Sequence, residues 1–486
     1  MIEIKEKNID AIYIHIPFCD KKCEYCDFCT FVRMEKEYRK YTDYLIREIR
    51  MYPKFKYDTI YFGGGTPSVL SVEMIKEIME ELDWTENAEI TLELNPTDMT
   101  LKKLKEIKGI GINRLSIGIQ SFQNHVLEFI GRQHTSDEAV NVYKMAREAG
   151  FENITVDLMF GIPNQSINDL QKDLKILKEL KPENVSIYSL IWEEGTIFWS
   201  KLQKGILTEI DQDVEAQMYE MIIEFFNENA YCHYEISNFA RIDENIEKNG
   251  NIAKKFDDKE EIGFQNFPKI KNNAEILKNN IEISQKNTKI YDLCLENQKP
   301  ENKIFENAEN FEIIKEMQKN GGRHNLKYWK NKKFIGVGMS AAAYYGENRH
   351  SNVRAFNKYY KFLDNQELPI DENTIEIVDE TESEKLKKIL GLRLIQEGIE
   401  YFEDKKVEKL IKNGFLEKFV VEKINFLEKK DEKIEKFITV KEKEIKNKGK
   451  NNEYFAKKIT ENTYEIRLRL TKKGMLLAND VFVEFI

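Results

Sequence analysis

The sequence contains no long apolar run, and this absence limits where the protein can reside. None of the apolar stretches in its 486 residues is long enough to span a bilayer. The N-terminal MIEIKEKNID also lacks the apolar core of a secretory leader. We therefore expect a cytoplasmic protein, in a reducing compartment where cysteine thiolates survive.

An excess of positive charge is missing too. The chain carries 75 basic and 85 acidic residues, a net charge of −10, which argues against nucleic acid bound through a broad positive surface. Charged residues make up 33% of the chain, and much of that share falls in two biased stretches described below. At about 150 residues per domain, the length predicts two to three domains with ample material for a core.

Cysteine is scarce, but four of the six cysteines lie together, in YIHIPFCDKKCEYCDFCTF: Cys19, Cys23, Cys26 and Cys29. A disulfide framework is typical of small secreted domains, and a zinc site usually takes paired cysteines from two separate loops. Here there is one loop, and the other two cysteines, Cys232 and Cys294, are isolated. The C-x-x-x-C-x-x-C spacing allows three thiolates to hold three irons of a 4Fe-4S cluster. The fourth iron stays open to bind a small molecule and pass it an electron.

The first 240 residues alternate between short apolar runs and amphipathic segments. Runs rich in Ile, Val and Tyr that end at Gly or Pro predict strands, and 3.6-residue spacing of Leu, Ile and Met predicts helices. We expect strands at Ala11–Ile16, Thr59–Phe62, Glu89–Leu94, Arg114–Ile119, Ile154–Phe160 and Asn184–Leu190. The expected helices include Lys36–Met51, Val72–Leu82, Asp137–Ala149 and Ile167–Leu180. This alternation predicts an α/β fold: a partial (β/α)6 barrel of parallel strands with chemistry at their carboxyl ends, where the cysteine loop lies.

The rest of the chain divides into an insertion and a C-terminal region. Residues 241–322 are rich in Lys, Glu and Asn without clean periodicity, which predicts a disordered insertion, although a lid or a partner-docking element stays open. In 323–486 we expect a helix at Thr381–Gln396, a second biased stretch at Lys423–Lys458, and a strand at Tyr464–Leu470 that leads into a helix near Thr471. These elements predict a small α+β domain of winged-helix type.

Polar residues and glycines recur where the predicted strands end. GGGTP at Gly63–Pro67 follows a strand, and consecutive glycines allow close approach of a ligand to unhindered backbone groups. Glu93, Gln120 and Asp157 lie at or in later strands, and Arg132 lies in a loop. Each alone would be interpreted as a helix cap or a surface pair. Together they predict a ring around one barrel mouth, able to accept from an ammonium or a ribose hydroxyl and to clamp a carboxylate.

These motifs together resemble a known family. YIHIPFC…C…C, GGGTP, E-x-N-P, S-x-G-x-Q-S-F and D-L-x-x-G-x-P are similar to the radical S-adenosylmethionine superfamily and, within it, to the oxygen-independent coproporphyrinogen III oxidase group. The similarity covers residues 10–240 and returns in 323–486. In that family the open iron chelates S-adenosylmethionine, and electron transfer into its sulfonium can release a 5′-deoxyadenosyl radical. The resemblance implies cluster ligands Cys19, Cys23 and Cys26, and cofactor contacts at Tyr13, Tyr25, Gly64, Gly65, Thr66, Glu93, Gln120, Arg132 and Asp157. It implies no separate catalytic residue.

The group has two branches, a decarboxylating oxidase and a heme chaperone. Here the oxidase's long arm before the cysteines is absent, and CDFC matches the chaperone branch rather than the oxidase's C-x-C. RHNLKYW, Arg323–Trp329, resembles the chaperone's heme-binding segment, which implies heme contacts at His324 and Tyr328. A neutral imidazole is a common axial ligand of heme iron, although without the family we would interpret His324 as structural. The chaperone interpretation implies heme, an acceptor hemoprotein such as a membrane-associated respiratory one, and an electron donor such as flavodoxin or ferredoxin.

The chain departs from this family at three places. Ala342 stands where the glycine-rich segment often has a histidine, the 241–322 insertion separates SNFA from RHN, and Cys29 is an extra thiol beside three sufficient ligands. Two other hypotheses stay open. A true oxidase would remove hydrogen from two propionates and release carbon dioxide, and a redox sensor would keep the cluster without binding S-adenosylmethionine.

Overall fold

The computed structural model of this chain describes residues 8–97, 99–242, 317, 319–422 and 464–485. Most of the predicted 241–322 insertion and all of the biased stretch at Lys423–Lys458 lie outside these residues. In the part of the chain that is described, no helix combines the length and the apolar character needed to cross a bilayer.

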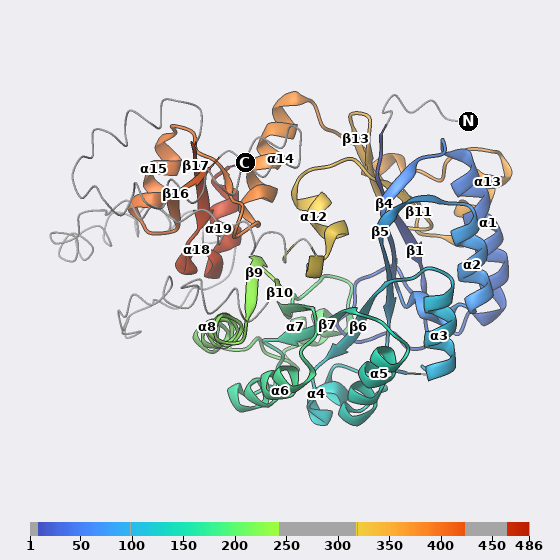
Figure 1. Cartoon of the computed structure of the whole chain (residues 1–486), viewed down its shortest axis with the longest axis horizontal. Helices are drawn as coiled ribbons and strands as arrows, with labels where there is room; N and C mark the ends of the chain where they lie inside the picture. The colour runs from blue at the N-terminus through green and yellow to red at the C-terminus, as the bar shows by residue number, and fades with distance from the viewer. Residues whose placement is uncertain (1–7, 98, 243–316, 318, 423–463, 486) are drawn as a thin grey trace, which may run out of the picture.

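A nine-stranded sheet forms the centre of the molecule (Figure 1). Six neighbouring strands are parallel: β1 (Ala11–Ile16), β4 (Lys56–Gly64), β5 (Asp83–Leu94), β6 (Arg114–Gln120), β7 (Asn153–Phe160) and β8 (Asn184–Ser189). This confirms the predicted parallel α/β sheet, although β4 and β5 begin earlier than the sequence indicated. One edge adds β10 (Asn238–Arg241), which pairs antiparallel with β8, and then β9 (Tyr231–Glu235), which pairs antiparallel with β10. The other edge ends at β11 (Ile335–Val337), so the barrel is open.

Helices cover the outer face of the sheet, as Figure 1 shows for α1 to α6. Their bounds are α1 (Tyr38–Met51), α2 (Val72–Glu80), α3 (Leu101–Gly109), α4 (Asn124–Phe129), α5 (Ser136–Glu148), α6 (Ile167–Leu180), α7 (Ile197–Gln203) and α8 (Gln212–Glu228). The predicted helix from Lys36 instead opens with a 3-10 turn, Glu35–Glu37. Capping boxes at Thr135 and Ser166 fix the starts of α5 and α6 by satisfying their first N–H groups.

Strand alternation separates the core from the site. Ile60, Phe62, Ile90 and Leu92 are buried in the apolar core. The residues that alternate with them, such as Tyr61 and Glu93, belong to the opposite face, because successive side chains of a strand point to opposite sides of the sheet. The barrel interior is therefore polar, while its outer layer supplies the hydrophobic stabilisation.

The C-terminal region begins in contact with the barrel and extends its sheet. Helix α12 (Arg323–Trp329) contacts β4, and β11 pairs with β1. The elements β12 (Ala342–Tyr345), β13 (Asn348–Ser351), α13 (Phe356–Asp364) and β14 (Glu376–Ile377) follow. Buried Glu48 of α1 anchors the residues around β11 to β13, because its carboxylate accepts from the Gly338 N–H (2.8 Å) and the Asn352 amide (2.7 Å). The first part of the predicted 323–486 unit thus shares the barrel's sheet.

A second, smaller unit ends the chain. Strands β15 (Ile399–Glu400), β17 (Tyr464–Leu470) and β16 (Leu416–Glu422) form an antiparallel sheet. It is accompanied by α14 (Glu380–Leu392), α15 (Lys405–Lys412), α18 (Lys472–Leu476) and α19 (Ala478–Val483). The strand at Tyr464–Leu470 has the predicted bounds, and Thr471 caps α18 as expected. The predicted helix to Gln396 ends four residues early, because Leu394 and Ile395 instead bond to the edge strand β9.

Candidate functional site

The cysteine loop lies at the carboxyl end of β1, where the barrel mouth opens. It runs from β2 (Phe18–Cys19) to β3 (Phe31–Val32), which pair with each other. The Glu24 N–H donates to the Ile130 carbonyl (3.4 Å), and the Glu24 carbonyl accepts from the Phe198 N–H (3.0 Å). These bonds hold the loop against neighbouring units, so the thiols of Cys19, Cys23 and Cys26 have fixed surroundings.

The three thiols suit a cationic iron centre. Burial raises the pKa of both Cys19 and Cys26 to about 11, and the charge of Cys23 adds to both shifts. A thiol with such a pKa stays protonated in water, but bound iron displaces the proton and stabilises the thiolate. Within the described residues the cysteine thiols are free of disulfides, and no three His, Cys, Asp or Glu side chains converge on one ion position.

Cys29 stands apart from this set. Its sulfur lies 3.8 Å from the carbonyl of Arg354, and burial raises its thiol pKa. Its own carbonyl accepts from Nε2 of buried His15 (3.1 Å). Cys29 thus joins the loop to the C-terminal region and to β1.

The glycine segment contacts the chain itself. The N–H of Gly64 donates to Glu93 (3.3 Å), that of Gly65 to the Ile16 carbonyl (2.8 Å) and that of Thr66 to the Phe18 carbonyl (2.7 Å). The chain itself therefore uses the N–H groups of Gly64, Gly65 and Thr66, and the cofactor contact that the resemblance implies at these residues stays a prediction. The backbone of Gly65 nonetheless packs so closely against that of Phe18 that only glycine fits, since a Cβ at Gly65 would lie 2.5 Å from the Phe18 carbonyl oxygen. The segment thus positions the start of the cysteine loop, and a bound cofactor would contact the atoms of the segment that these hydrogen bonds leave free.

Two carboxyl groups face the interior below the mouth. The Tyr61 hydroxyl donates to Glu93 Oε1 (2.7 Å), and the Ser116 hydroxyl donates to Asp157 Oδ2 (3.0 Å). Burial raises the pKa of Glu93 to about 7. Burial, followed by the negative charge of Glu93, raises that of Asp157 to about 7 as well. The pair titrates near neutrality, so a cationic ligand group would favour the ionised state of both.

Arg132 joins the loop to the ring. Its Nη1 lies 3.6 Å from Cys23 Sγ, and its Nη2 donates to Asn95 Oδ1 (2.6 Å) and to the Gly118 carbonyl. The Asn95 amide in turn donates to the Thr66 hydroxyl (2.8 Å). A shallow cleft lies here, lined by Asp20, Lys21, Cys23, Asn95, Arg132 and His134 among others. Arg132 and Lys21 bring positive charge to this cleft, beside the carboxyl group of Asp20.

Gln120 and Tyr25 complete the mouth on the other side. Gln120 has a φ of 72°, a strained value for a residue with a Cβ, and its Oε1 accepts from the Tyr188 hydroxyl (3.0 Å). Tyr25 packs on an apolar cluster that includes Ile130 and Phe198. Tyr13 lies deeper, where its hydroxyl bonds to His15 Nδ1 (3.1 Å) and its ring stacks on Tyr61.

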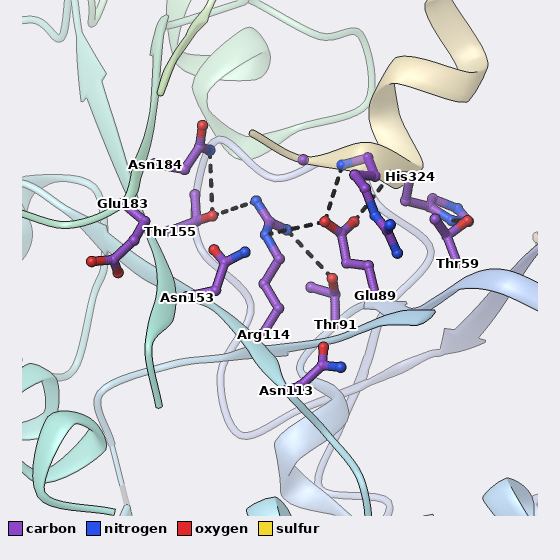
Figure 2. A network of polar contacts seen from close by, with 12 residues as sticks. Thr59, Glu89, Thr91, Asn113, Arg114, Asn153, Thr155, Glu183, Asn184 and His324 are labelled. Carbon is purple, nitrogen blue, oxygen red and sulfur yellow. Dashed lines mark hydrogen bonds and ion pairs between the residues drawn. The ribbon is translucent and has the colours of Figure 1, made fainter. Parts of the chain in front are cut away.

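His324 and Tyr328 lie at the opposite end of the barrel, near the amino ends of the strands (Figure 2 shows His324). Lys327, on the same helix, pairs with Asp10, just before β1, and with Asp58 in β4. His324 is 1% exposed; its Nδ1 bonds to the Thr59 hydroxyl (2.9 Å) and its Nε2 to the Tyr328 hydroxyl (2.7 Å). The two residues share a helix face as predicted, but both imidazole nitrogens are engaged. Burial, with nearby Lys327 and Arg114, lowers the pKa of His324 to about 3, so the ring is neutral.

Sequence reasoning missed several residues of the site: His15, Tyr61, Asn95, Ser116 and Tyr188. Period-2 alternation could have found Tyr61, because it lies two residues before Gly63 on an identified strand. Asn95 stands in the noted E-x-N-P motif. No comparable signal exists for Tyr188, whose contact to Gln120 joins strands far apart in the sequence.

Comparison with known proteins gives consistent results. Residues 13–177 match the family model of the radical SAM superfamily. The chain is 37% identical over 235 residues to the heme chaperone HemW of Lactococcus lactis, covering 48% of this chain and 62% of that protein. It is 30% identical over 394 residues to the heme chaperone HemW of Bacillus subtilis, covering 79% and 83%. It is also 33% identical over 239 residues to radical S-adenosyl methionine domain-containing protein 1, mitochondrial, of Danio rerio, covering 48% and 54%.

Among solved structures, the chain resembles coproporphyrinogen III oxidase (HemN) from Escherichia coli. The TM-score is 0.63 at 19% identity, over 98% of this chain and 89% of that one. At this identity the likeness shows a shared fold, and the activity of the oxidase does not follow from it.

Proposed function

The chain belongs to the heme chaperone HemW branch of the radical SAM superfamily, and from this premise we propose that it binds heme and delivers it to an acceptor hemoprotein. The main support is the similarity to the Bacillus subtilis heme chaperone over 83% of that protein's length. The CDFC spacing and the RHNLKYW segment favour the same branch.

In this proposal Cys19, Cys23 and Cys26 hold a 4Fe-4S cluster, as the family implies. S-adenosylmethionine binds beside it: Glu93 and Asp157 accept from its ammonium and ribose hydroxyls, and Arg132 attracts its carboxylate. Tyr13, Tyr25, Gly64, Gly65, Thr66 and Gln120 complete the proposed contacts. When bound, the cluster and S-adenosylmethionine supply one-electron chemistry. An electron donor such as flavodoxin or ferredoxin would reduce the cluster.

Heme binding at His324 and Tyr328 is part of the proposal, and it requires a change in the position of α12. The neutral state of His324 suits iron coordination. Coordination by Nε2 would replace its hydrogen bond to the Tyr328 hydroxyl, and the residue is enclosed. Heme ligation there therefore implies that α12 moves away from the end of the barrel.

One preparation can test the proposal. Protein with its cluster rebuilt anaerobically is titrated with heme, and a second portion is incubated with coproporphyrinogen III, S-adenosylmethionine and a reductant. We expect stoichiometric heme binding, transfer of heme to an apo-hemoprotein and no protoporphyrinogen IX. Formation of protoporphyrinogen IX would make the chain an oxidase. A cluster that binds neither S-adenosylmethionine nor heme would favour the redox-sensor hypothesis.

The heme ligand has its own variant. His324→Ala removes a proposed donor to iron, so the heme spectrum should change or heme retention should weaken. His134→Ala is a matched control, because His134 is also buried and neutral but lies beside the barrel mouth. An unchanged spectrum and affinity in His324→Ala would reject the axial role while leaving heme transfer itself open to the first test.

A further inference from the structure

Tyr61 of β4 connects the two ends of the barrel interior. Its ring stacks on His324 of α12, with ring centres 5.2 Å apart and planes inclined by 30°. Its hydroxyl donates to Glu93 Oε1 at 2.7 Å. One side chain therefore contacts both the histidine of the RHNLKYW segment and the carboxylate proposed to receive the cofactor's ammonium.

The position of His324 is fixed by its backbone as well as its ring. Glu89 accepts from the N–H groups of Arg323 (3.1 Å) and His324 (3.0 Å), so a carboxylate occupies the first turn of α12, as Figure 2 shows. Arg114 lies 4.0 Å from that carboxylate and donates to the Thr155 hydroxyl. The imidazole adds its bonds to Thr59 and Tyr328. His324 is thus held rigidly against the Tyr61 ring.

From these contacts we propose that His324 is a positioning residue: through Tyr61 it orients Glu93 for S-adenosylmethionine. The proposal rests on the proposed function, because it takes Glu93 as the acceptor of the cofactor's ammonium. It assigns the RHNLKYW segment a role in the cofactor site at the other end of the barrel, independent of whether His324 also coordinates heme.

The hydroxyl of Tyr61 has an electrostatic role that a merely structural contact would not have. The Tyr61 and Gly64 bonds and the charge of Arg114 stabilise the ionised Glu93, while burial opposes its ionisation. Asp157 faces the same interior, and the charge of Glu93 raises the pKa of Asp157. The other titratable groups near Glu93 are Tyr13, Tyr188 and Tyr328. Loss of the Tyr61 hydroxyl removes one of three stabilising interactions, so a higher pH is needed to ionise Glu93.

The test measures the affinity of the cluster-loaded full chain for S-adenosylmethionine by anaerobic calorimetry, from pH 6 to pH 9. Tyr61→Phe keeps the stacked ring and removes the hydroxyl, and His324→Leu removes the stacked partner. We expect both variants to bind the cofactor roughly tenfold more weakly at pH 7 and to need a higher pH for tight binding. Lys327→Ala is the matched control, since it breaks the ion pairs of α12 with Asp10 and Asp58 but does not touch Tyr61.

The outcomes separate the two proposals. If the parent protein with a full cluster does not bind S-adenosylmethionine, the proposed function fails. If the parent binds and Glu93→Gln does not, while Tyr61→Phe keeps the parent's affinity and pH profile, the inference is wrong and the proposed function stands. An equal shift in Lys327→Ala would also overturn it, because the effect would then follow helix docking alone. Tyr61→Phe keeps the test decisive even where His324→Leu fails to fold.

Discussion

The carboxyl pair of the site makes a quantitative prediction through Asp157→Asn. Asparagine has nearly the same shape and still accepts from the Ser116 hydroxyl that now bonds to the carboxylate. It removes only the charge. We expect the variant to be more stable than the parent above neutral pH and to bind S-adenosylmethionine more weakly, since the proposed contact loses its charge.

The magnitude follows from the pKa of Asp157, which rises from 3.8 to about 7 through burial and then through the charge of Glu93. A folded-state pKa above the unfolded one means that stability is lost as pH rises from about 4 to about 7. At about 1.4 kcal/mol per unit, the carboxylate costs at most about 4 kcal/mol above pH 7. Because the side chain is partly exposed to solvent, we expect a gain of about 1–3 kcal/mol at pH 8 for the variant. At pH 5.5 the gain should be about half as large, because this pH lies about midway between the ordinary pKa of 3.8 and the folded-state pKa of about 7, so only half of the cost has accumulated.

The assay is urea unfolding of the anaerobic, cluster-loaded protein without S-adenosylmethionine, at pH 5.5 and pH 8. Asp43→Asn, at an exposed carboxylate of α1 paired with Arg39, serves as the control and should change stability by less than about 0.5 kcal/mol at either pH. A destabilised Asp157→Asn at pH 8, or a gain that does not grow between the two pH values, would refute the electrostatic account of this pair.

Three further tests probe the rest of the site. Cys29→Ser should keep the iron content of the rebuilt protein, whereas Cys23→Ser should lose most of it; equal losses in an iron assay would make Cys29 a ligand. Gly65→Ala should abolish S-adenosylmethionine binding in calorimetry and destabilise the cysteine loop, because its Cβ would stand 2.5 Å from a backbone carbonyl oxygen; retained binding would show that the segment can shift. Arg114→Met should destabilise the protein by about 3–5 kcal/mol, because it leaves Glu89 buried without its cation. The double variant with Glu89→Gln should recover part of that loss in denaturant unfolding, and a fully additive loss would argue against the pairing.

Much of the fold could be predicted because most of its strands and helices are indicated by local sequence patterns. The bounds of β1, β17 and α6 match the expected ones, since apolar periodicity and capping residues act over a few positions. The edges of the sheet could not be predicted. β11 is three residues long and joins β1 from more than 300 positions away, and no local pattern records such a partner.

The candidate site divides in the same way. The cysteine spacing and the positions of Glu93 near the end of a strand and of Asp157 within a strand follow from the sequence, because parallel strands bring their carboxyl ends to one edge. The sequence did not indicate that the N–H groups after Gly63 would be used by the chain itself. It also did not place His324 at the other end of the barrel from the cysteines, with both ring nitrogens engaged.

By itself the sequence determined the thiolate spacing, the α/β alternation and the family, because each depends on residues close together in the chain. Only the tertiary structure decided that Tyr61 joins His324 to Glu93 and that the charge of Glu93 raises the pKa of Asp157. Those properties arise from burial and from distances between side chains on different strands, and both are set only when the chain folds and the strands pair.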